Sequence, residues 1–314
     1  MKLSIAEINK LPLNTKVEGA LFVKASNVDY VKKFVSMKLS DGELEIDAKM
    51  WKSVDAPEKG SVIDIKAATN EYNDVRNIIV NSYTPSDLGR MDFVNPGPVG
   101  IDSLKSSFEK LLSSIEHEDL CSFVMRCYEP ILGNITSCPA AVGHHHVYPT
   151  GTFHHTIEVT ELARYSALVM GKYRSCSANV DLVIAGALLH DIGKYYCYTY
   201  NDGVPEMTDL GKNLDHIAVG QRVLDRTAIE LGLIDKTWYS DLLHIVLAHH
   251  GKLEYGSPVA PNSVEAYIVS EADMISSQVQ AMQSEIDKLN VMDMEWSDKK
   301  SFKFGTFLHA RKEL

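Results

Sequence analysis

The sequence lacks the features that mark several classes of protein. Its five cysteines include no Cys-x-x-Cys pair, and their irregular spacing argues against both a zinc knuckle and a disulfide framework. The longest uninterrupted apolar run, around residues 182–189, is far shorter than the roughly 20 residues that cross a bilayer. The N-terminus has no signal-peptide core. We therefore expect a soluble, cytoplasmic protein with reduced thiols and no membrane partner.

The chain also lacks net positive charge. Its formal charge is −11, which argues against electrostatic capture of nucleic acid by the whole protein. Residues 1–90 carry 13 basic and 13 acidic side chains, so the whole negative excess follows residue 90. An acidic second half suits phosphate chemistry if bound cations offset its carboxylates. With 314 residues and 45% hydrophobic content, the chain can form two domains that each have a core.

The first part of the chain has the period-two pattern of short antiparallel strands. Alternate apolar residues share a face over residues 17–23, 35–39 and 44–50, and an Asp41-Gly42 pair favours a hairpin between the last two runs. Further runs at 62–65 and 78–80 complete five strands. We predict a small all-β barrel over residues 1–90, with a linker rich in proline and glycine at 83–98.

The outward faces of these strands carry aromatic and basic side chains side by side. Single-stranded nucleic acid needs flat rings on which bases stack and positive charge for its backbone. A second interpretation stays open, in which the rings pack against the other domain or a partner chain. The predicted nucleic-acid-binding residues are Phe22, Lys24, Phe34, Lys38, Lys49 and Trp51.

After residue 98 the apolar pattern changes to a helical period, and several segments end at glycine. Residues 99–314 are therefore expected to form a second domain that is nearly all α. The predicted helices cover residues 101–115, 120–128, 156–170, 180–190, 214–231, 241–250 and 263–289.

Histidine is concentrated in this helical part, with ten of the twelve histidines between residues 144 and 250. Neutral imidazole binds borderline divalent metals and a carboxylate can bridge two, so histidine and aspartate on several helices can build a metal centre. A single histidine of this set would more often cap a helix or lie in a core. The end of the 180–190 helix favours a metal, because His190 and Asp191 would otherwise be buried without partners. Lys194 lies close enough to reach a phosphate oxygen.

The histidines and aspartates resemble the pattern of the HD-domain phosphohydrolases, in which an isolated histidine precedes a His-Asp pair and a distant aspartate. The matching positions here are His155, His190-Asp191 and Asp273. Within this family the chain is similar to the YhaM-type 3′→5′ exoribonucleases, which join an N-terminal OB-fold to a C-terminal HD domain. The similar segments are residues 46–51, 144–148 and 249–258, whereas His154 replaces an acidic residue of that branch.

The resemblance implies a centre of two divalent metals. His155, His190, Asp191 and Asp273 would hold the first ion, and His216 with His249 or His250 the second. Because His249 and His250 are adjacent, both can be ligands only if their helix ends there, which Gly251 permits. Manganese is the expected metal, with iron, cobalt, zinc and magnesium as alternatives. The loop histidines His144, His145 and His146 are candidate phosphate contacts.

The expected reaction is hydrolysis of single-stranded RNA from its 3′ end to nucleoside 5′-monophosphates, with single-stranded DNA as a further candidate substrate. Asp191 would bridge two metals that activate water, and Lys194 would neutralise charge on the nonbridging oxygens. Two alternatives stay open: an HD phosphohydrolase of free or cyclic nucleotides, and a nucleic-acid-binding module with an inactive HD site. Whether the chain forms a homo-oligomer is also open.

Overall fold

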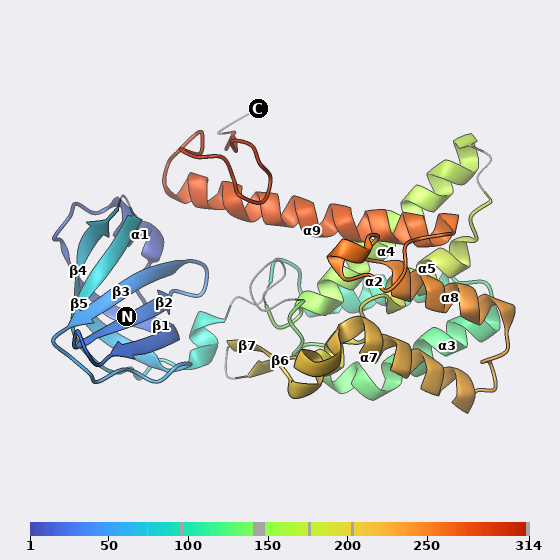
Figure 1. Cartoon of the computed structure of the whole chain (residues 1–314), viewed down its shortest axis with the longest axis horizontal. Helices are drawn as coiled ribbons and strands as arrows, with labels where there is room; N and C mark the ends of the chain where they lie inside the picture. The colour runs from blue at the N-terminus through green and yellow to red at the C-terminus, as the bar shows by residue number, and fades with distance from the viewer. Residues whose placement is uncertain (74, 95–96, 141–147, 175–176, 202–203, 312–314) are drawn as a thin grey trace. The chain divides into compact units, whose positions relative to one another are not determined.

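The chain divides into two compact units. The computed structural model describes residues 1–73, 75–94, 97–140, 148–174, 177–201 and 204–311 (Figure 1). The first unit consists of residues 1–95, 201–204 and 284–314, and the second of residues 96–200 and 205–283. None of the helices in these described ranges is long and apolar enough to cross a membrane.

Within the described residues, the first unit contains a closed barrel of five strands, as expected from the sequence. Its strands pair in the order β1-β2-β3-β5-β4, and β4 returns to β1. All neighbours are antiparallel except β3 and β5, which run parallel, so the barrel is OB-like. A short helix α1 (Ile5–Lys10) precedes β1 (Lys16–Asp29), β2 (Phe34–Ser40), β3 (Glu45–Trp51), β4 (Val62–Tyr72) and β5 (Val75–Pro85).

The barrel interior is filled by the alternate apolar residues that the sequence indicated. The predicted inward residues of β2 and β3, among them Val35, Leu39 and Ile46, are buried in one cluster.

The hairpin between these strands forms at Asp41-Gly42. The Asp41 carboxylate accepts hydrogen bonds from the backbone N–H groups of Ile5, Glu43 and Leu44, and Gly42 has a φ of 97°, which glycine adopts without strain.

Phe22 is not part of an exposed face, so its predicted place on the nucleic-acid surface is wrong. Its neighbours Leu21 and Val23 fill the barrel interior, while Phe22 packs in a separate cluster with Phe93. Phe93 ends the short 3-10 helix η1 (Arg90–Phe93), which follows β5. Only 2% of Phe22 is exposed, because the chain after the barrel covers a position that strand alternation alone places outside.

The second unit is largely helical, as expected. A two-stranded sheet of β6 (Tyr198–Asn201) and β7 (Val204–Met207) interrupts the helices in sequence. Strands of four residues carry too few alternations to be found from periodicity. The helices are α2 (Ile101–Ser113), α3 (Glu118–Tyr128), α4 (Gly151–Arg174), α5 (Val180–Leu189), α6 (Lys194–Cys197), α7 (Asp209–Glu230), α8 (Thr237–Ala248) and, as far as residue 283, α9 (Val264–Val291), with 3-10 turns η2 (Glu129–Asn134) and η3 (Leu253–Tyr255).

Helix α5 lies in the core of the second unit. Every residue from Leu182 to Leu189 is buried, and the helix contacts α3, α4 and α8 (Figure 1). A helix that is apolar on all sides is typical of such a position. The Tyr128 hydroxyl donates to the Leu188 carbonyl at 2.6 Å and anchors the last turn. Packing therefore fixes the point at which the chain delivers His190 and Asp191.

Candidate metal centre

Asp191 lies between two groups of metal-ligating side chains. Its Oδ2 is 3.4 Å from Nε2 of His155 and 3.2 Å from Nε2 of His190. Its Oδ1 is 3.5 Å from Nε2 of His216 and 3.8 Å from Nε2 of His249. The two oxygens of this buried carboxylate therefore face two different groups of candidate ligands.

The first group consists of His155, His190 and Asp273, whose candidate ligand atoms lie within 4.8 Å of one another. His155 comes from α4, His190 caps the end of α5, and Asp273 comes from α9. The Asp273 Oδ1 atom is 3.0 Å from Nε2 of His155. Three segments that are far apart in sequence therefore converge on one point, together with Asp191.

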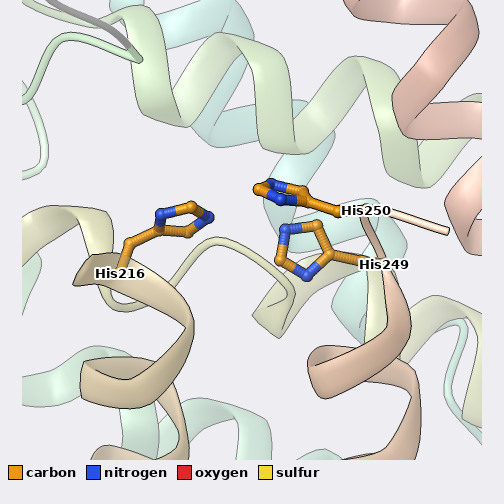
Figure 2. Close-up of side chains that lie close together, drawn as sticks. All are labelled: His216, His249 and His250. Carbon is orange, nitrogen blue, oxygen red and sulfur yellow. The ribbon is translucent and has the colours of Figure 1, made fainter. Parts of the chain in front are cut away.

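The second group consists of His216, His249 and His250, whose candidate ligand atoms also lie within 4.8 Å of one another. Figure 2 shows these rings converging from α7 and from the end of α8. Helix α8 stops at Ala248, and Gly251 has a φ of 76°. The helix end that two adjacent ligands require is therefore present, and the two ring centroids are 4.3 Å apart.

Backbone carbonyl groups hold three of these histidines by their Nδ1 atoms. A carbonyl oxygen only accepts, so each Nδ1 carries a proton, and in the neutral imidazole Nε2 then carries the lone pair. This is the tautomer that binds a metal through Nε2. The partners are Ala187 for His190 at 2.7 Å, Val246 for His249 at 2.7 Å and Tyr255 for His250 at 3.0 Å.

Side chains hold the other two histidines in the same tautomer. The Ser276 hydroxyl donates to Glu158 at 3.0 Å and so accepts from Nδ1 of His155, also at 3.0 Å. Nδ1 of His216 donates to Asp215 Oδ1 at 2.7 Å. This hydrogen bond is the main cause that lowers the pKa of Asp215 to about 2, so Asp215 is an ionised acceptor at neutral pH.

Buried nitrogen atoms test whether these groups fit metal ions. The Nε2 atoms of His190, His216 and His249 are buried and make no hydrogen bond to any residue that the structure describes. A buried polar atom left in this state costs about 1–3 kcal/mol, and divalent cations in the two groups would satisfy these lone pairs. Imidazole with carboxylate suits manganese, iron, cobalt and zinc. The donor set therefore fits divalent metals.

Lys194 places a fixed positive charge beside the bridging carboxylate. Its Nζ is 2.7 Å from Asp191 Oδ2, and its side chain is only 9% exposed. Burial lowers the pKa of Lys194, but the charge and the hydrogen bond of Asp191, together with the charge of Asp273, outweigh burial and raise that pKa. Burial likewise raises the pKa of Asp191, whereas Lys194 and His190 together hold it well below its usual range. Both groups are therefore charged at neutral pH.

A cavity of about 300 Å³ borders the centre. Tyr255, which sequence reasoning did not single out, offers a ring that is 53% exposed. The similar segment 249–258 contains this residue and could have identified it. Ser277 and Gln278 carry no such signal, because helical periodicity does not tell which face of α9 borders a cavity. The lining residues are Lys194, His249, His250, Tyr255, Asp273, Met274, Ser277 and Gln278.

On the barrel, three aromatic rings surround the ammonium group of Lys49. Its Nζ is 5.7 Å from the ring centroids of Phe34 and Trp51 and 5.4 Å from that of Tyr72. Phe34 and Trp51 pair across β2 and β3. Trp51 is 51% and Tyr72 66% exposed. Tyr72 was missed because β4 extends well beyond its predicted apolar run. These four residues are called the aromatic patch below.

Two other predicted barrel lysines lie beside acidic neighbours. Nζ of Lys24 is 3.1 Å from Glu45, and Nζ of Lys38 is 3.1 Å from Asp47. Their charges are therefore partly offset, unlike that of Lys49 among its rings. The candidate phosphate contacts His144, His145 and His146 lie outside the described residues.

Known proteins are similar to the part of the chain that carries the candidate centre. Residues 152–277 match the family model described as HD domain, a range that includes all members of both groups. The chain is 27% identical over 274 residues to the 3′-5′ exoribonuclease YhaM of Halalkalibacterium halodurans, covering 82% of this chain and 81% of that protein. It is 26% identical over 278 residues to YhaM of Listeria welshimeri, covering 85% of this chain and 86% of that protein.

A further relative has a different description. The dihydroneopterin 2′,3′-cyclic phosphate phosphodiesterase of Methanocaldococcus jannaschii is 33% identical over 171 residues, covering 54% of this chain and 64% of that protein. The matches as a whole confirm the resemblance that the sequence indicated, both to the HD domain and to the YhaM exoribonucleases.

Proposed function

We propose that this chain, which carries an HD domain after an OB-like barrel, is a metal-dependent 3′→5′ exoribonuclease that releases nucleoside 5′-monophosphates. The strongest support is the position of Asp191, a buried carboxylate whose two oxygens face two separate groups of histidines. The similarity to YhaM extends over more than four fifths of the chain and includes proteins described as exoribonucleases. The polymer substrate and the two-metal centre are proposals that follow from these observations.

Each group would hold one divalent ion, and Asp191 would contribute one of its two oxygens to each ion. His155, His190 and Asp273 complete one set, and His216, His249 and His250 complete the other. When bound, such ions activate water as a nucleophile and offset phosphate charge. The Nδ1 hydrogen bonds keep the rings in place before the ions arrive, which lowers the reorganisation needed on binding.

Lys194 would act directly on the substrate. Its ammonium group lines the cavity beside Asp191, where it can donate to a nonbridging phosphate oxygen and neutralise charge in the transition state. The oxygen of water forms a bond to phosphorus while the bond from phosphorus to the 3′ oxygen breaks. The departing 3′ oxygen takes a proton, and the phosphate stays on the released nucleotide.

The cavity would bind the 3′-terminal nucleotide of the RNA, and the aromatic patch would bind the nucleotides upstream of it. About 300 Å³ lies at the lower end of ligand pocket sizes and suits one terminal nucleotide, with Tyr255 as a stacking surface. The rings of Phe34, Trp51 and Tyr72 would stack on upstream bases, and Lys49 would contact the backbone. Stacking does not distinguish RNA from DNA, so single-stranded DNA is a second candidate polymer.

A small cyclic phosphate is the alternative substrate. The Methanocaldococcus jannaschii phosphodiesterase is more identical to this chain than the two exoribonucleases, although over fewer residues. An HD centre by itself does not determine what carries the phosphate. The aromatic patch favours the polymer, because a phosphodiesterase of small molecules has no need of it. The complete set of ligand side chains argues against an inactive HD site.

The test is a manganese-supplemented digestion of 5′-labelled single-stranded RNA, beside a panel of free and cyclic nucleotides. We expect a ladder that shortens from the 3′ end with the wild type and none with Asp191→Asn. Asp241→Asn, at an exposed position of α8, is the matched control and should behave as wild type. If the RNA stays intact while a cyclic nucleotide of the panel is hydrolysed, the protein is a phosphodiesterase of small molecules instead.

A further inference from the structure

Helix α7 contains a backbone conformation that residues with a side chain rarely adopt. Asp215 has φ 60° and ψ 165°, which interrupts the helix. This region is populated essentially by glycine, and other residues persist there only when their surroundings compensate. The next residue is His216, a member of the second group. The interruption therefore occurs where α7 presents a candidate ligand.

The carboxylate of Asp215 makes two hydrogen bonds to this neighbour. Its Oδ1 accepts from the backbone N–H of His216 at 2.6 Å and from Nδ1 of the same residue at 2.7 Å. The Asp215 side chain is 68% exposed, whereas that of His216 is 7% exposed. Asp215 thus holds the outer edge of the ring, while Nε2 on the inner edge lies 3.5 Å from Asp191.

We infer that Asp215 is a positioning residue, whose unusual backbone conformation is retained because it places a carboxylate against Nδ1 of His216. The carboxylate fixes the tautomer of the ring and makes its Nε2 a stronger ligand for a divalent cation. The other four ligand histidines of the described chain have backbone carbonyls or Ser276 at Nδ1. A charged acceptor forms a stronger hydrogen bond than these neutral groups. The inference rests on the proposed metal-dependent function.

The test compares Asp215→Gly and Asp215→Asn in the full chain after metal removal. Mn²⁺ binding is measured by titration calorimetry, and stability by thermal unfolding without metal. Glycine accepts the backbone conformation but removes the acceptor, so we expect the Mn²⁺ affinity of the second group, which contains His216, to fall about 10–100-fold. The unfolding temperature without metal should be no lower than that of the wild type. Asparagine keeps an acceptor oxygen but not the charge, so it should recover only part of the affinity.

Three results would overturn the inference. The first is an Asp215→Gly protein that binds Mn²⁺ as tightly as the wild type. The second is an Asp215→Asn protein as weak as Asp215→Gly, which would remove the hydrogen bond as the cause. The third is a clearly lower unfolding temperature for metal-free Asp215→Gly, which would assign Asp215 to helix stability. A wild-type chain that binds no Mn²⁺ would instead contradict the proposed function, and the inference with it.

Discussion

Gly193 lies directly against the carbonyl group of His216. A Cβ atom on Gly193 would be 1.9 Å from that oxygen and 2.6 Å from the backbone nitrogen of Gly220. The φ of Gly193 is −64°, so glycine is needed here for space and not for an unusual conformation. The turn that carries His190 and Asp191 therefore touches the backbone of α7, which fixes the separation of the two ligand groups.

Replacement of Gly193 by alanine should displace His216. Because both close atoms belong to the backbone, the strain must move α7 or the turn, at a cost of about 1–3 kcal/mol. We expect at least a 10-fold loss of kcat/KM on RNA and a lower unfolding temperature. Gly133→Ala is the matched control, since a Cβ there meets nothing within 4 Å. Equal activities of the two variants would contradict the contact.

Removal of metal should destabilise the protein. Without metal, the buried Nε2 atoms of His190, His216 and His249 make no hydrogen bond to any described residue. Mn²⁺ at 100 times its Kd should raise the free energy of unfolding by about 2.7 kcal/mol per site. Urea unfolding with and without Mn²⁺ measures this gain. Asp191→Asn should gain much less, and a full gain in that variant would exclude Asp191 as a shared ligand.

His249 should cost the metal-free protein stability as the pH falls below neutrality. Burial, followed by His250 and His190, holds the pKa of His249 well below its ordinary value. The unfolded chain then binds a proton that the folded chain excludes. This contribution to stability is complete at a pH above the histidine pKa in the unfolded chain, about 6.5, and is lost progressively as the pH falls below that value. Chemical unfolding at pH 7.5 and 5.5 measures the effect, which should shrink in His249→Gln; an unchanged slope in that variant would exclude His249 as a source.

Replacement of Lys194 by methionine should affect turnover more than substrate binding. The variant keeps the length of the side chain but removes the charge that would act on the transition state. We expect kcat to fall by about 100-fold, with a smaller change in KM. Lys212→Met is the control, because that lysine is 62% exposed on α7. An unchanged kcat for Lys194→Met would exclude the direct role.

The sequence was most informative where a local pattern had a single structural solution. Strand alternation determined the inward residues Val35 and Leu39, and Gly251 permitted the helix end beside His250 that the structure shows. The prediction that Phe22 is exposed was wrong, because its burial depends on Phe93, which is distant in sequence. Nor could any local pattern identify Asp215, since its backbone conformation and its hydrogen bond to His216 exist only in the folded chain.

The Ser276–Glu158 pair behind His155 was likewise beyond sequence reasoning. Serine and glutamate are common on helices, and nothing in their spacing along the chain marks them as partners. Their role becomes visible only when α4 and α9 come together and the Ser276 hydroxyl lies between Glu158 and Nδ1 of His155. The ligands themselves could be predicted because their chemistry is unusual, whereas the groups that orient them are chemically ordinary.

Loss of the aromatic patch should weaken binding of long RNA but leave the chemistry intact. Each stacked base contributes about 1–3 kcal/mol, so Trp51→Ala with Tyr72→Ala should raise KM for a long single strand by at least 10-fold. A dinucleotide, too short to need upstream contacts, should be cleaved at the wild-type rate. Tyr30→Ala is the control, because Tyr30 is 74% exposed on the same barrel but outside the patch. Equal losses on long and short substrates would show that the double variant perturbs the enzyme as a whole. An unchanged KM on the long strand would exclude the patch as its binding surface.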